Sequence, residues 1–421
     1  MSIGSGGDVG DATPGGRALG NDGRKSVTTF STDLALEIYT EDQPGRWPLT
    51  YEEWADRARN SLSTEAFDYV AGSAGREETA RANRTAFDNW RLRVRMLRTA
   101  PERRLHTEIL GTPTPGPIML APIGVQEILH PAAELASAAA ASEAQVPFIA
   151  STASSTSLED IAAVMGEAPR WFQLYPGARH DVDASLIRRA EDAGYSALVV
   201  SLDTTLPGFR PRDLAKSYLP FLRGMGLANF RTDPVFRSGV NVDDVAELGR
   251  EFLRTMLVPH LAWDDVARLI ESTRLPVLIK GVLDAEDALI AQSCGAAGIV
   301  VSNHGGRQVD GAIGALDALP AIARAVGGEI PVLFDSGIRS GSDVLKAMAL
   351  GASGVLVGRP YAYGLAVAGA PGVARVIRQM LAEIDSALAL SGNKSVADIS
   401  RDSVVPAGQV TATSIHATTS I

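Results

Sequence analysis

The feature that most constrains the fold of this chain is a repeated alternation of short apolar runs with segments of helical composition. The apolar runs have the length and the Val, Ile and Leu content of buried parallel strands. Eight of them follow one another, at residues 118–123, 147–152, 171–175, 197–203, 276–281, 298–304, 331–337 and 354–359. Helix-like segments separate most of them, at residues 132–144, 183–193, 263–271, 285–293, 316–325 and 342–350. This rhythm predicts an α/β domain folded as a single (β/α)8 TIM barrel. A doubly wound open sheet is the alternative, and it is weakened because no G-x-G-x-x-G follows an early strand.

Four segments fall outside this rhythm. Residues 1–35 are rich in Gly, Ser, Asp and Thr, so we expect a disordered N-terminal tail. Residues 404–421 form a second polar tail, which leaves 45–403 as the folded domain. Residues 49–100 look helical and open with a capping box at Thr50–Glu53, which predicts an N-terminal helical segment. The fourth segment, 204–275, is far longer than a crossover requires and follows a strand's carboxyl end, so we interpret it as a substrate lid or specificity insert.

Composition limits the class of protein. Apolar residues make up 45% and charged residues 21% of the chain, as in ordinary globular proteins. A net charge of −10 argues against a general nucleic-acid binder but not against small anionic substrates. The single cysteine, Cys294, excludes an intrachain disulfide and is interpreted as a buried, inert thiol. The chain has no apolar stretch of about 18 residues and no signal-peptide pattern at its N-terminus, so we expect a cytoplasmic protein without a membrane span.

Polar side chains or glycines follow nearly every predicted strand at the point where the strand ends. In a barrel, the carboxyl ends of all strands meet at one face, where such residues converge on a single site. In chain order, and with the two apolar residues that precede Gly124, the residues at the strand ends are Pro122, Ile123, Gly124, Ser151, Gln173, Tyr175, Ser201, Asp203, Lys280, Ser302, His304, Asp335, Gly337, Arg339, Gly358 and Arg359. A purely structural barrel does not need this set, which therefore predicts a catalytic face.

The stretch 302–308, Ser-Asn-His-Gly-Gly-Arg-Gln, carries most of the chemistry. His304 suits proton abstraction because the ordinary pKa of imidazole lies near neutrality, and the guanidinium of Arg307 matches a carboxylate. Together they suggest an enzyme that deprotonates a group attached to a carboxylic acid, whereas the alternative is a core histidine and a surface arginine. Asp203 is a candidate to raise the basicity of His304. Lys280 either stabilises negative charge on a reduced ring or forms a Schiff base. Asp203 and Lys280 can each belong instead to a structural ion pair.

The last two predicted strands carry a candidate phosphate site. Residues 335–339 read Asp-Ser-Gly-Ile-Arg and residues 358–360 read Gly-Arg-Pro. Glycines let backbone N–H groups approach an anion, while Arg339 and Arg359 supply positive charge. Because the loops after strands seven and eight are the usual phosphate site of this fold, we expect the phosphate of a cofactor there.

These motifs resemble the FMN-dependent L-2-hydroxy acid oxidising family, which includes glycolate oxidase and lactate oxidase. The resemblance spans roughly 45–400 and rests on the stretches 68–72, 121–124, 172–175, 279–281, 301–308, 335–339 and 358–360. It implies an FMN enzyme that oxidises a small 2-hydroxy carboxylate with O2 as acceptor. It also implies a homo-oligomer, a tetramer or an octamer. We expect no metal, no nucleic-acid partner and no membrane partner.

The resemblance also implies roles for particular residues. His304 removes the substrate α-proton, or accepts the hydroxyl proton if a hydride leaves, and Asp203 supports it. The implied catalytic residues are His304, Asp203, Tyr175 and Lys280, and the implied substrate-binding residues are Tyr69, Tyr175, Arg210, His304 and Arg307. The implied FMN-binding residues are Pro122, Ile123, Gly124, Ser151, Gln173, Ser201, Lys280, Ser302, Asp335, Gly337, Arg339, Gly358 and Arg359.

Within the family, the stretches 119–125, 208–213, 221–224 and 232–236 are most similar to lactate 2-monooxygenase. Gly124 replaces an alanine of many oxidases, which changes the room beside the flavin for oxygen and for retained keto acid. If the keto acid stays bound, peroxide decarboxylates it to a shortened acid, CO2 and water. If it leaves first, the products are the free keto acid and H2O2. Ala153 is smaller than its counterparts, so a side chain larger than methyl is an alternative to lactate. A dehydrogenase and an FMN-dependent isomerase are further alternatives.

Overall fold

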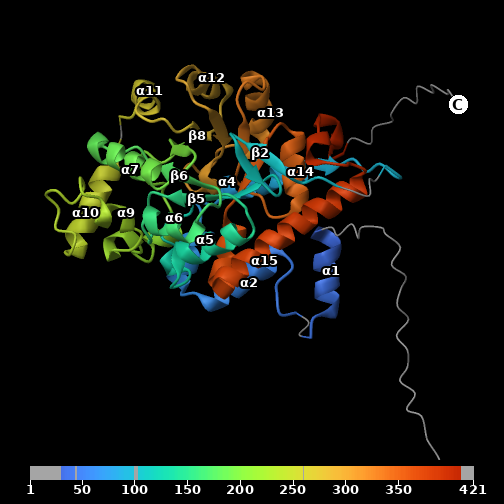
Figure 1. Cartoon of the computed structure of the whole chain (residues 1–421), viewed down its shortest axis with the longest axis horizontal. Coiled ribbons are helices and arrows are strands. Elements are labelled where there is room, and N and C mark those ends of the chain that lie inside the picture. The colour runs from blue at the N-terminus through green and yellow to red at the C-terminus, as the bar shows by residue number, and fades with distance from the viewer. Residues whose placement is uncertain (1–29, 43–44, 99–102, 259, 409–421) are drawn as a thin grey trace, which may run out of the picture.

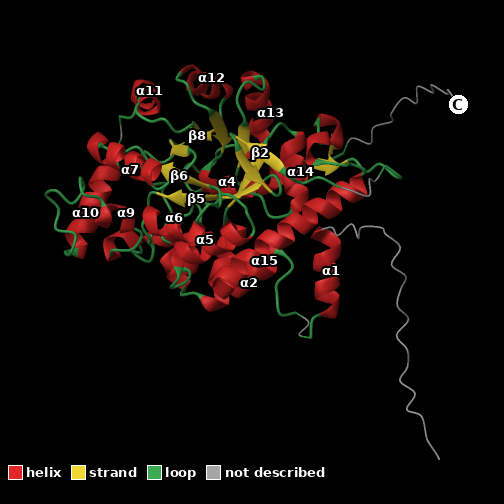
Figure 2. Cartoon of the chain, viewed as in Figure 1, coloured by secondary structure: helices red, strands yellow, loops and turns green. Residues whose placement is uncertain are grey.

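Eight parallel strands close into a barrel at the centre of the molecule (Figures 1 and 2). The computed structural model describes residues 30–42, 45–98, 103–258 and 260–408. Each strand pairs with the next along the chain, and the last closes onto the first through Val355 opposite Ile118. The strands are β4 Ile118–Leu120, β5 Phe148–Ser151, β6 Arg170–Leu174, β7 Leu198–Ser201, β8 Val277–Val282, β9 Gly298–Val301, β10 Val332–Phe334 and β11 Gly354–Val357. The predicted TIM barrel is confirmed, with most strands ending one to three residues before the predicted runs do.

A helix follows each strand and packs on the outside of the barrel (Figure 2). These helices are α5 Ala133–Glu143, α6 Leu158–Met165, α7 His180–Asp192, α11 Trp263–Glu271, α12 Ala285–Ser293, α13 Ala315–Val326, α14 Gly341–Ala349 and α15 Arg359–Ser391. The predicted bounds of α11 and α12 are confirmed to the residue. None of the helices among the described residues is long and apolar enough to cross a membrane.

The inside of the barrel is a packed core rather than a pore. Its fully buried side chains include Met119, Ile149, Trp171, Val199, Leu278, Val300, Leu333 and Leu356. The hairpin of β2 Thr107–Ile109 and β3 Thr112–Thr114 places Ile109 against this cluster. The indole Nε1 of Trp171 donates a hydrogen bond to Thr112 Oγ1 at 3.0 Å, which fixes the hairpin to the barrel. A filled interior leaves the strand ends as the place for a binding site.

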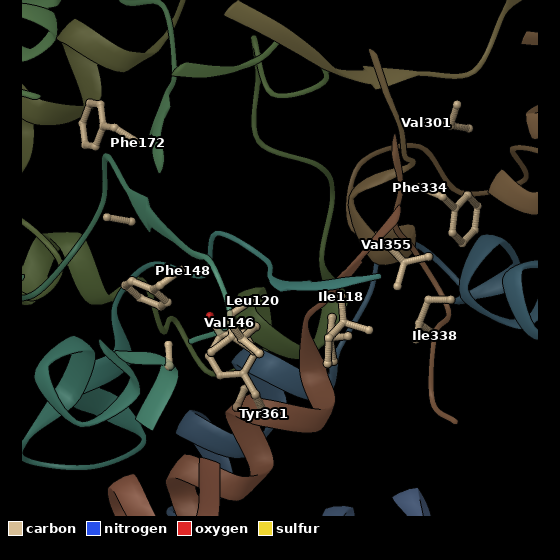
Figure 3. Close-up of a cluster of buried hydrophobic side chains, with 14 of the residues drawn as sticks. Ile118, Leu120, Val146, Phe148, Phe172, Val301, Phe334, Ile338, Val355 and Tyr361 are labelled. Atoms are coloured by element: carbon tan, nitrogen blue, oxygen red, sulfur yellow. The ribbon is translucent and has the colours of Figure 1, made fainter. Parts of the chain in front are cut away.

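The opposite faces of the same strands pack under the helices. Figure 3 shows this second cluster, with Leu120 of β4 near Val146 and Tyr361. Tyr361 of α15 also donates a hydrogen bond to the backbone oxygen of Ala121 at 2.8 Å. Burial of aromatic and branched side chains on this scale is the main source of stability for such a domain. The cluster also holds the strand ends, and the loops that follow them, in fixed positions.

The N-terminal segment is helical, as predicted. Its helices are α1 Phe30–Thr40, α2 Tyr51–Ser61, α3 Thr64–Ala71 and α4 Glu78–Asp88. The predicted capping box is present, because Thr50 accepts from the backbone of Glu53 and Glu53 accepts from the backbone of Thr50. Helices α1 and α2 pack along α15 (Figure 1).

Two predicted boundaries need correction. Helix α1 begins at Phe30, inside the stretch 1–35 expected to be disordered, and residues 1–29 lie outside the described residues. Strand β12 Val404–Pro406 lies inside the stretch 404–421 expected to be a tail. It pairs antiparallel with β1 Trp90–Leu92, and Val404 is buried opposite Leu92. The cross-strand pairing outweighs the polar composition there; residues 409–421 lie outside the described residues.

The long insert lies between β7 and α11 and holds four short helical elements. They are α8 Pro211–Leu214, the 3-10 turn η2 Pro220–Arg223, α9 Ala228–Thr232 and α10 Val245–Met256. Phe221, Phe230 and Phe252 form its small core, with ring centroids 4.7 and 4.9 Å apart for the two contacts that Phe252 makes. Arg212 of α8 forms an ion pair with Glu77 at 2.7 Å, so the insert is fastened to the N-terminal segment.

Candidate active site

A cavity of about 850 Å3 opens at the carboxyl ends of the barrel strands. Its wall includes residues of the N-terminal segment, the strand ends and the insert. Of the predicted site residues, those that line it are Tyr69, Pro122, Ile123, Gly124, Ser151, Tyr175, Arg210, Lys280, His304, Arg307, Asp335, Gly337, Arg339, Gly358 and Arg359. The structure therefore brings most of the predicted set into one site, from positions that extend along the chain from Tyr69 to Arg359.

The four remaining predicted residues, Gln173, Ser201, Asp203 and Ser302, do not line the cavity and lie behind residues that do. Gln173 accepts a hydrogen bond from Ser151 Oγ at 3.1 Å and donates one to Ser201 Oγ at 3.2 Å. Ser302 Oγ accepts from Lys280 Nζ at 2.8 Å. Gln173, Ser201 and Ser302 are almost fully buried. The hydrogen bonds of Gln173 and Ser302 hold the lining residues Ser151 and Lys280 in position.

His304 begins the short 3-10 turn η3 His304–Gly306 with φ of +57°, a conformation that few non-glycine residues adopt. Its ring Nδ1 lies 3.0 Å from Asp203 Oδ1. A carboxylate only accepts, so Nδ1–H donates, and Nε2 keeps its lone pair in the neutral ring. Thr204 Oγ1 donates to the same carboxylate oxygen at 3.0 Å. Residues 203, 204 and 304 thus hold one tautomer of a partly buried imidazole that faces the cavity.

Electrostatics favour this neutral imidazole. Burial lowers the pKa of His304, and the adjacent carboxylate of Asp203 offsets only part of that effect. Burial alone would raise the pKa of Asp203, but the charges of His304 and Lys280 outweigh it and lower the pKa to about 2. Asp203 Oδ2 is buried and has no hydrogen-bond partner among the described residues. A permanently ionised carboxylate beside a neutral base is suited to stabilise the imidazolium that forms when the base takes a proton.

Lys280 is held as a cation. Its Nζ lies 3.1 Å from Asp335 Oδ2 and donates to Ser302 Oγ. Burial alone would lower the pKa of Lys280, but Asp335 and then Asp203 outweigh it and raise the pKa. A Schiff-base lysine requires a neutral amine, so this environment favours the alternative role, a fixed positive charge in the cavity.

Two guanidinium groups lie on the insert side of the cavity. Arg307 Nη1 donates to the backbone oxygens of Tyr69 at 2.6 Å and Gly72 at 2.8 Å. Burial and then repulsion from Arg210 lower the pKa of Arg307 to about 9. Arg210 Nη2 donates to Gln308 Oε1 at 2.9 Å. Because these two partly buried cations repel each other, an anion bound between them is stabilised.

Tyr175 lies against the base. Its ring stacks on His304 with centroids 6.4 Å apart and an interplanar angle of 23°. Burial, and then the charge of Asp203, raises the pKa of Tyr175, so its phenol stays protonated at neutral pH and can donate a hydrogen bond.

Four further lining residues follow the last two strands, and they are Gly337, Arg339, Gly358 and Arg359. Arg359 donates to the backbone oxygens of Val70 and Gly305, each at 3.0 Å, and carries no ion pair among the described residues. The distribution of charge suits a long anionic cofactor, with its phosphate near the two arginines and an electron-accepting ring near Lys280 and His304. The residues present therefore fit FMN, which supplies a two-electron acceptor when bound.

Two residues that support the site, Gln308 and Glu134, were not singled out from the sequence. Gln308 Nε2 donates to the backbone oxygens of Asp203 at 2.7 Å and Leu206 at 2.9 Å, so it joins the β9 loop to the insert. Glu134 of α5 accepts from the backbone of Gln126 at 3.2 Å and Ser155 at 3.0 Å, beneath two loops of the cavity wall. The position of Gln308 directly after Arg307 could have indicated from the sequence that it belongs to the site. Nothing in the sequence around Glu134 indicated its role.

The structure explains the glycine at position 124 by the packing of two loops rather than by room for a ligand. A Cβ at this position would lie 2.7 Å from the backbone oxygen of Ala153 and 3.0 Å from its Cβ. The same oxygen accepts a hydrogen bond from Val125 N at 2.9 Å. Glycine is thus required for the two loops to approach each other.

The TIM barrel carries an imidazole–carboxylate pair, two neighbouring guanidinium groups and a candidate phosphate site at the last two strands. This combination is typical of the flavin-dependent oxidoreductases of this fold. Comparison with known proteins agrees. Residues 58–406 match the family model described as FMN-dependent dehydrogenase. The chain belongs to this family of FMN-dependent enzymes that oxidise 2-hydroxy acids.

Individual relatives cover most of the chain. An FMN-dependent alpha-hydroxy acid dehydrogenase of Penicillium citrinum is 43% identical over 82% of this chain and 87% of its own length. An L-lactate oxidase of Lysinibacillus sphaericus is 38% identical over 88% of this chain and 95% of its own. The crystal structure of mandelate oxidase with (S)-4-hydroxymandelic acid superposes with a TM-score of 0.76 and 41% identity, covering 83% of this chain and 97% of that one.

Proposed function

We propose that the protein oxidises an L-2-hydroxy acid at C2 with FMN as cofactor and O2 as the final electron acceptor. The observation that carries this proposal is the position of the His304–Asp203 pair in one cavity with Arg210 and Arg307. A 2-hydroxy acid requires a base at C2 or at its hydroxyl and a cation for its carboxylate, one carbon away. The L-lactate oxidase and mandelate oxidase relatives support the same substrate class.

In this proposal each residue has one task. Arg307 and Arg210 hold the carboxylate, and Tyr69 lies below the Arg307 guanidinium, with 5.3 Å between the guanidinium carbon and the ring centroid. His304 Nε2 takes the proton from C2 or from the hydroxyl, while Asp203 stabilises the imidazolium. Tyr175 donates to the hydroxyl oxygen. Lys280 would supply a positive charge to the ring of the bound cofactor.

We further propose the monooxygenase outcome, in which one hydroxy acid and one O2 give a carboxylic acid shortened by one carbon, CO2 and water. It requires the keto acid to stay bound while O2 is reduced to peroxide, which then decarboxylates it. The support for this outcome is the resemblance of residues 119–125 and 208–213 to lactate 2-monooxygenase, together with the position of Gly124 on the cavity wall. The oxidase outcome, keto acid and H2O2, is the alternative that the L-lactate oxidase relatives favour. A homo-oligomer and a cytoplasmic location remain expectations.

The test uses FMN-loaded protein mixed anaerobically with 2-hydroxy acids. We expect the visible flavin absorbance to bleach, and His304→Gln to slow bleaching by about 100- to 10,000-fold, the usual contribution of a general base. His106→Gln is the matched control, since His106 is exposed and does not line the cavity. Unchanged bleaching in His304→Gln with FMN still bound would reject His304 as the base. In air, free keto acid with stoichiometric H2O2 would reject the monooxygenase outcome.

A further inference from the structure

The cavity has an apolar arm that the carboxylate clamp and the cofactor end do not explain. Six of its lining residues come from η2, α10 and their flanks in the insert: Leu219, Phe221, Phe252, Leu253, Met256 and Leu257. Facing them, Val125 and Ala153 come from the loops after β4 and β5. A Cβ on Gly226 would meet Val125, Ala153 and Phe221 at 2.7, 3.0 and 3.2 Å, so the insert and the barrel loops meet directly at this wall.

The arm begins beside the catalytic imidazole. The carboxyl end of α10 is anchored on two loops, because Thr255 O accepts from Ala178 N at 2.7 Å and Val258 N donates to Thr205 O at 3.3 Å. One loop follows Tyr175, and the other carries Thr204, whose Oγ1 lies 3.3 Å from His304 Nδ1. Met256 and Leu257 therefore lie next to the reacting end of a bound hydroxy acid rather than at a remote surface.

The arm carries almost no charge. Between Thr204 and Leu257, the single charged residue that lines the cavity is Arg210, which is one of the two clamp cations. Apolar walls reject a polar side chain, because its hydrogen bonds to water are lost without replacement. They favour an apolar one in proportion to the surface removed from water.

We propose that the substrate is an L-2-hydroxy acid whose side chain is bulky and apolar, of aryl or branched alkyl type, rather than methyl or a second carboxylate. This inference rests on the proposed function and specifies its substrate class. The carboxylate binds Arg210 and Arg307, C2 faces His304, and the side chain enters the arm between Ala153 and Met256. The small side chain of Ala153 keeps the arm open at its entrance.

The experiment compares rates of anaerobic flavin reduction by L-lactate, L-2-hydroxyisocaproate, L-3-phenyllactate and L-malate. One methylene in an apolar pocket changes kcat/KM by about 10- to 200-fold, so we expect the two bulky substrates to exceed lactate by about 100-fold or more. L-malate should be the poorest. If lactate or malate equals the bulky acids, the apolar arm does not select the substrate. If no hydroxy acid reduces the flavin, the proposed function itself fails.

Two variants separate the arm from general effects. Met256→Gln should reduce the phenyllactate-to-lactate ratio by about tenfold, whereas Met96→Gln, at an exposed methionine outside the cavity, should leave the ratio unchanged. Binding provides a readout without turnover. In the FMN-loaded protein, 3-phenylpropionate should perturb the flavin absorbance at about 100-fold lower concentration than propionate. Equal affinities, or a ratio that Met256→Gln does not change, would overturn the proposal.

Discussion

Glu134 offers a test of how burial controls the loops of the site. It lies in the first turn of α5 and is completely buried. Its Oε1 accepts from the backbone of Gln126 and of Ser155, and its Oε2 has no hydrogen-bond partner among the described residues. Burial raises the pKa of this carboxyl from 4.5 to about 7. The protonated form is therefore favoured in the folded protein over a range in which the unfolded chain ionises.

The magnitude and sign follow from linkage. A rise in pKa from 4.5 to about 7 corresponds to about 3 kcal/mol, at about 1.4 kcal/mol for each pH unit. Because the folded-state pKa is the higher one, this stability is fully present below pH 4.5 and is lost as pH rises to about 7. Glu134→Gln keeps an oxygen that accepts from the two backbone groups but never ionises. Its free energy of unfolding, relative to that of the wild type, should therefore rise by about 3 kcal/mol between about pH 4.5 and about pH 8.

The measurement is urea unfolding of the FMN-loaded wild type and Glu134→Gln across this pH range. Asp183 also has a pKa raised by burial to about 7, so the wild-type curve alone contains two contributions. The difference between variant and wild type removes the contribution of Asp183. The amide that the substitution introduces changes the free energy of unfolding by an amount that does not depend on pH. The test therefore rests only on how the difference between variant and wild type changes with pH. A difference that does not change with pH would refute the claim that this carboxyl titrates near neutrality in the folded protein.

Two further substitutions test the site itself. Asp203→Asn removes the negative charge that partly offsets the effect of burial on His304, so the acidic limb of the pH profile of kcat/KM should move to lower pH, and the plateau should fall by about 100-fold. If the acidic limb of the kcat/KM profile does not move, Asp203 does not influence the pKa of His304. Gly124→Ala places a Cβ 2.7 Å from the oxygen of Ala153 and should lower the free energy of unfolding by about 1–3 kcal/mol, measured by urea denaturation. Wild-type stability in that variant would contradict the observed loop packing.

The barrel was predictable because each strand is buried on both faces and is short enough to appear as one apolar run. The site was predictable for a related reason. Every strand end reaches the same face, so a residue at or near the end of a run, such as Lys280 or His304, enters the site by position alone. Ser151 and Asp335 also line the cavity and follow the same rule.

Features that depend on tertiary contacts were not predictable. Val404 reads as part of a polar tail, and only its pairing with Leu92 makes it a strand residue. Phe252 and Met256 lie one helical turn apart on α10, which indicates a buried face but not that this face lines a cavity. Glu134 sits in an alanine-rich helix, where a glutamate is ordinarily exposed to solvent.

The carboxyl end of α3 holds two guanidinium groups of the cavity next to each other. The last carbonyl groups of a helix have no partner within it and carry partial negative charge. Here Arg307 donates to Tyr69 O, Arg359 donates to Val70 O, and both donate to Gly72 O. These carbonyls orient the two guanidinium groups but do not neutralise them. Each cation is thus positioned by α3 and still available to an anion. One helix end thereby sets the distance between the proposed substrate carboxylate and the cofactor phosphate, which explains why the N-terminal segment belongs to the site although it lies outside the barrel.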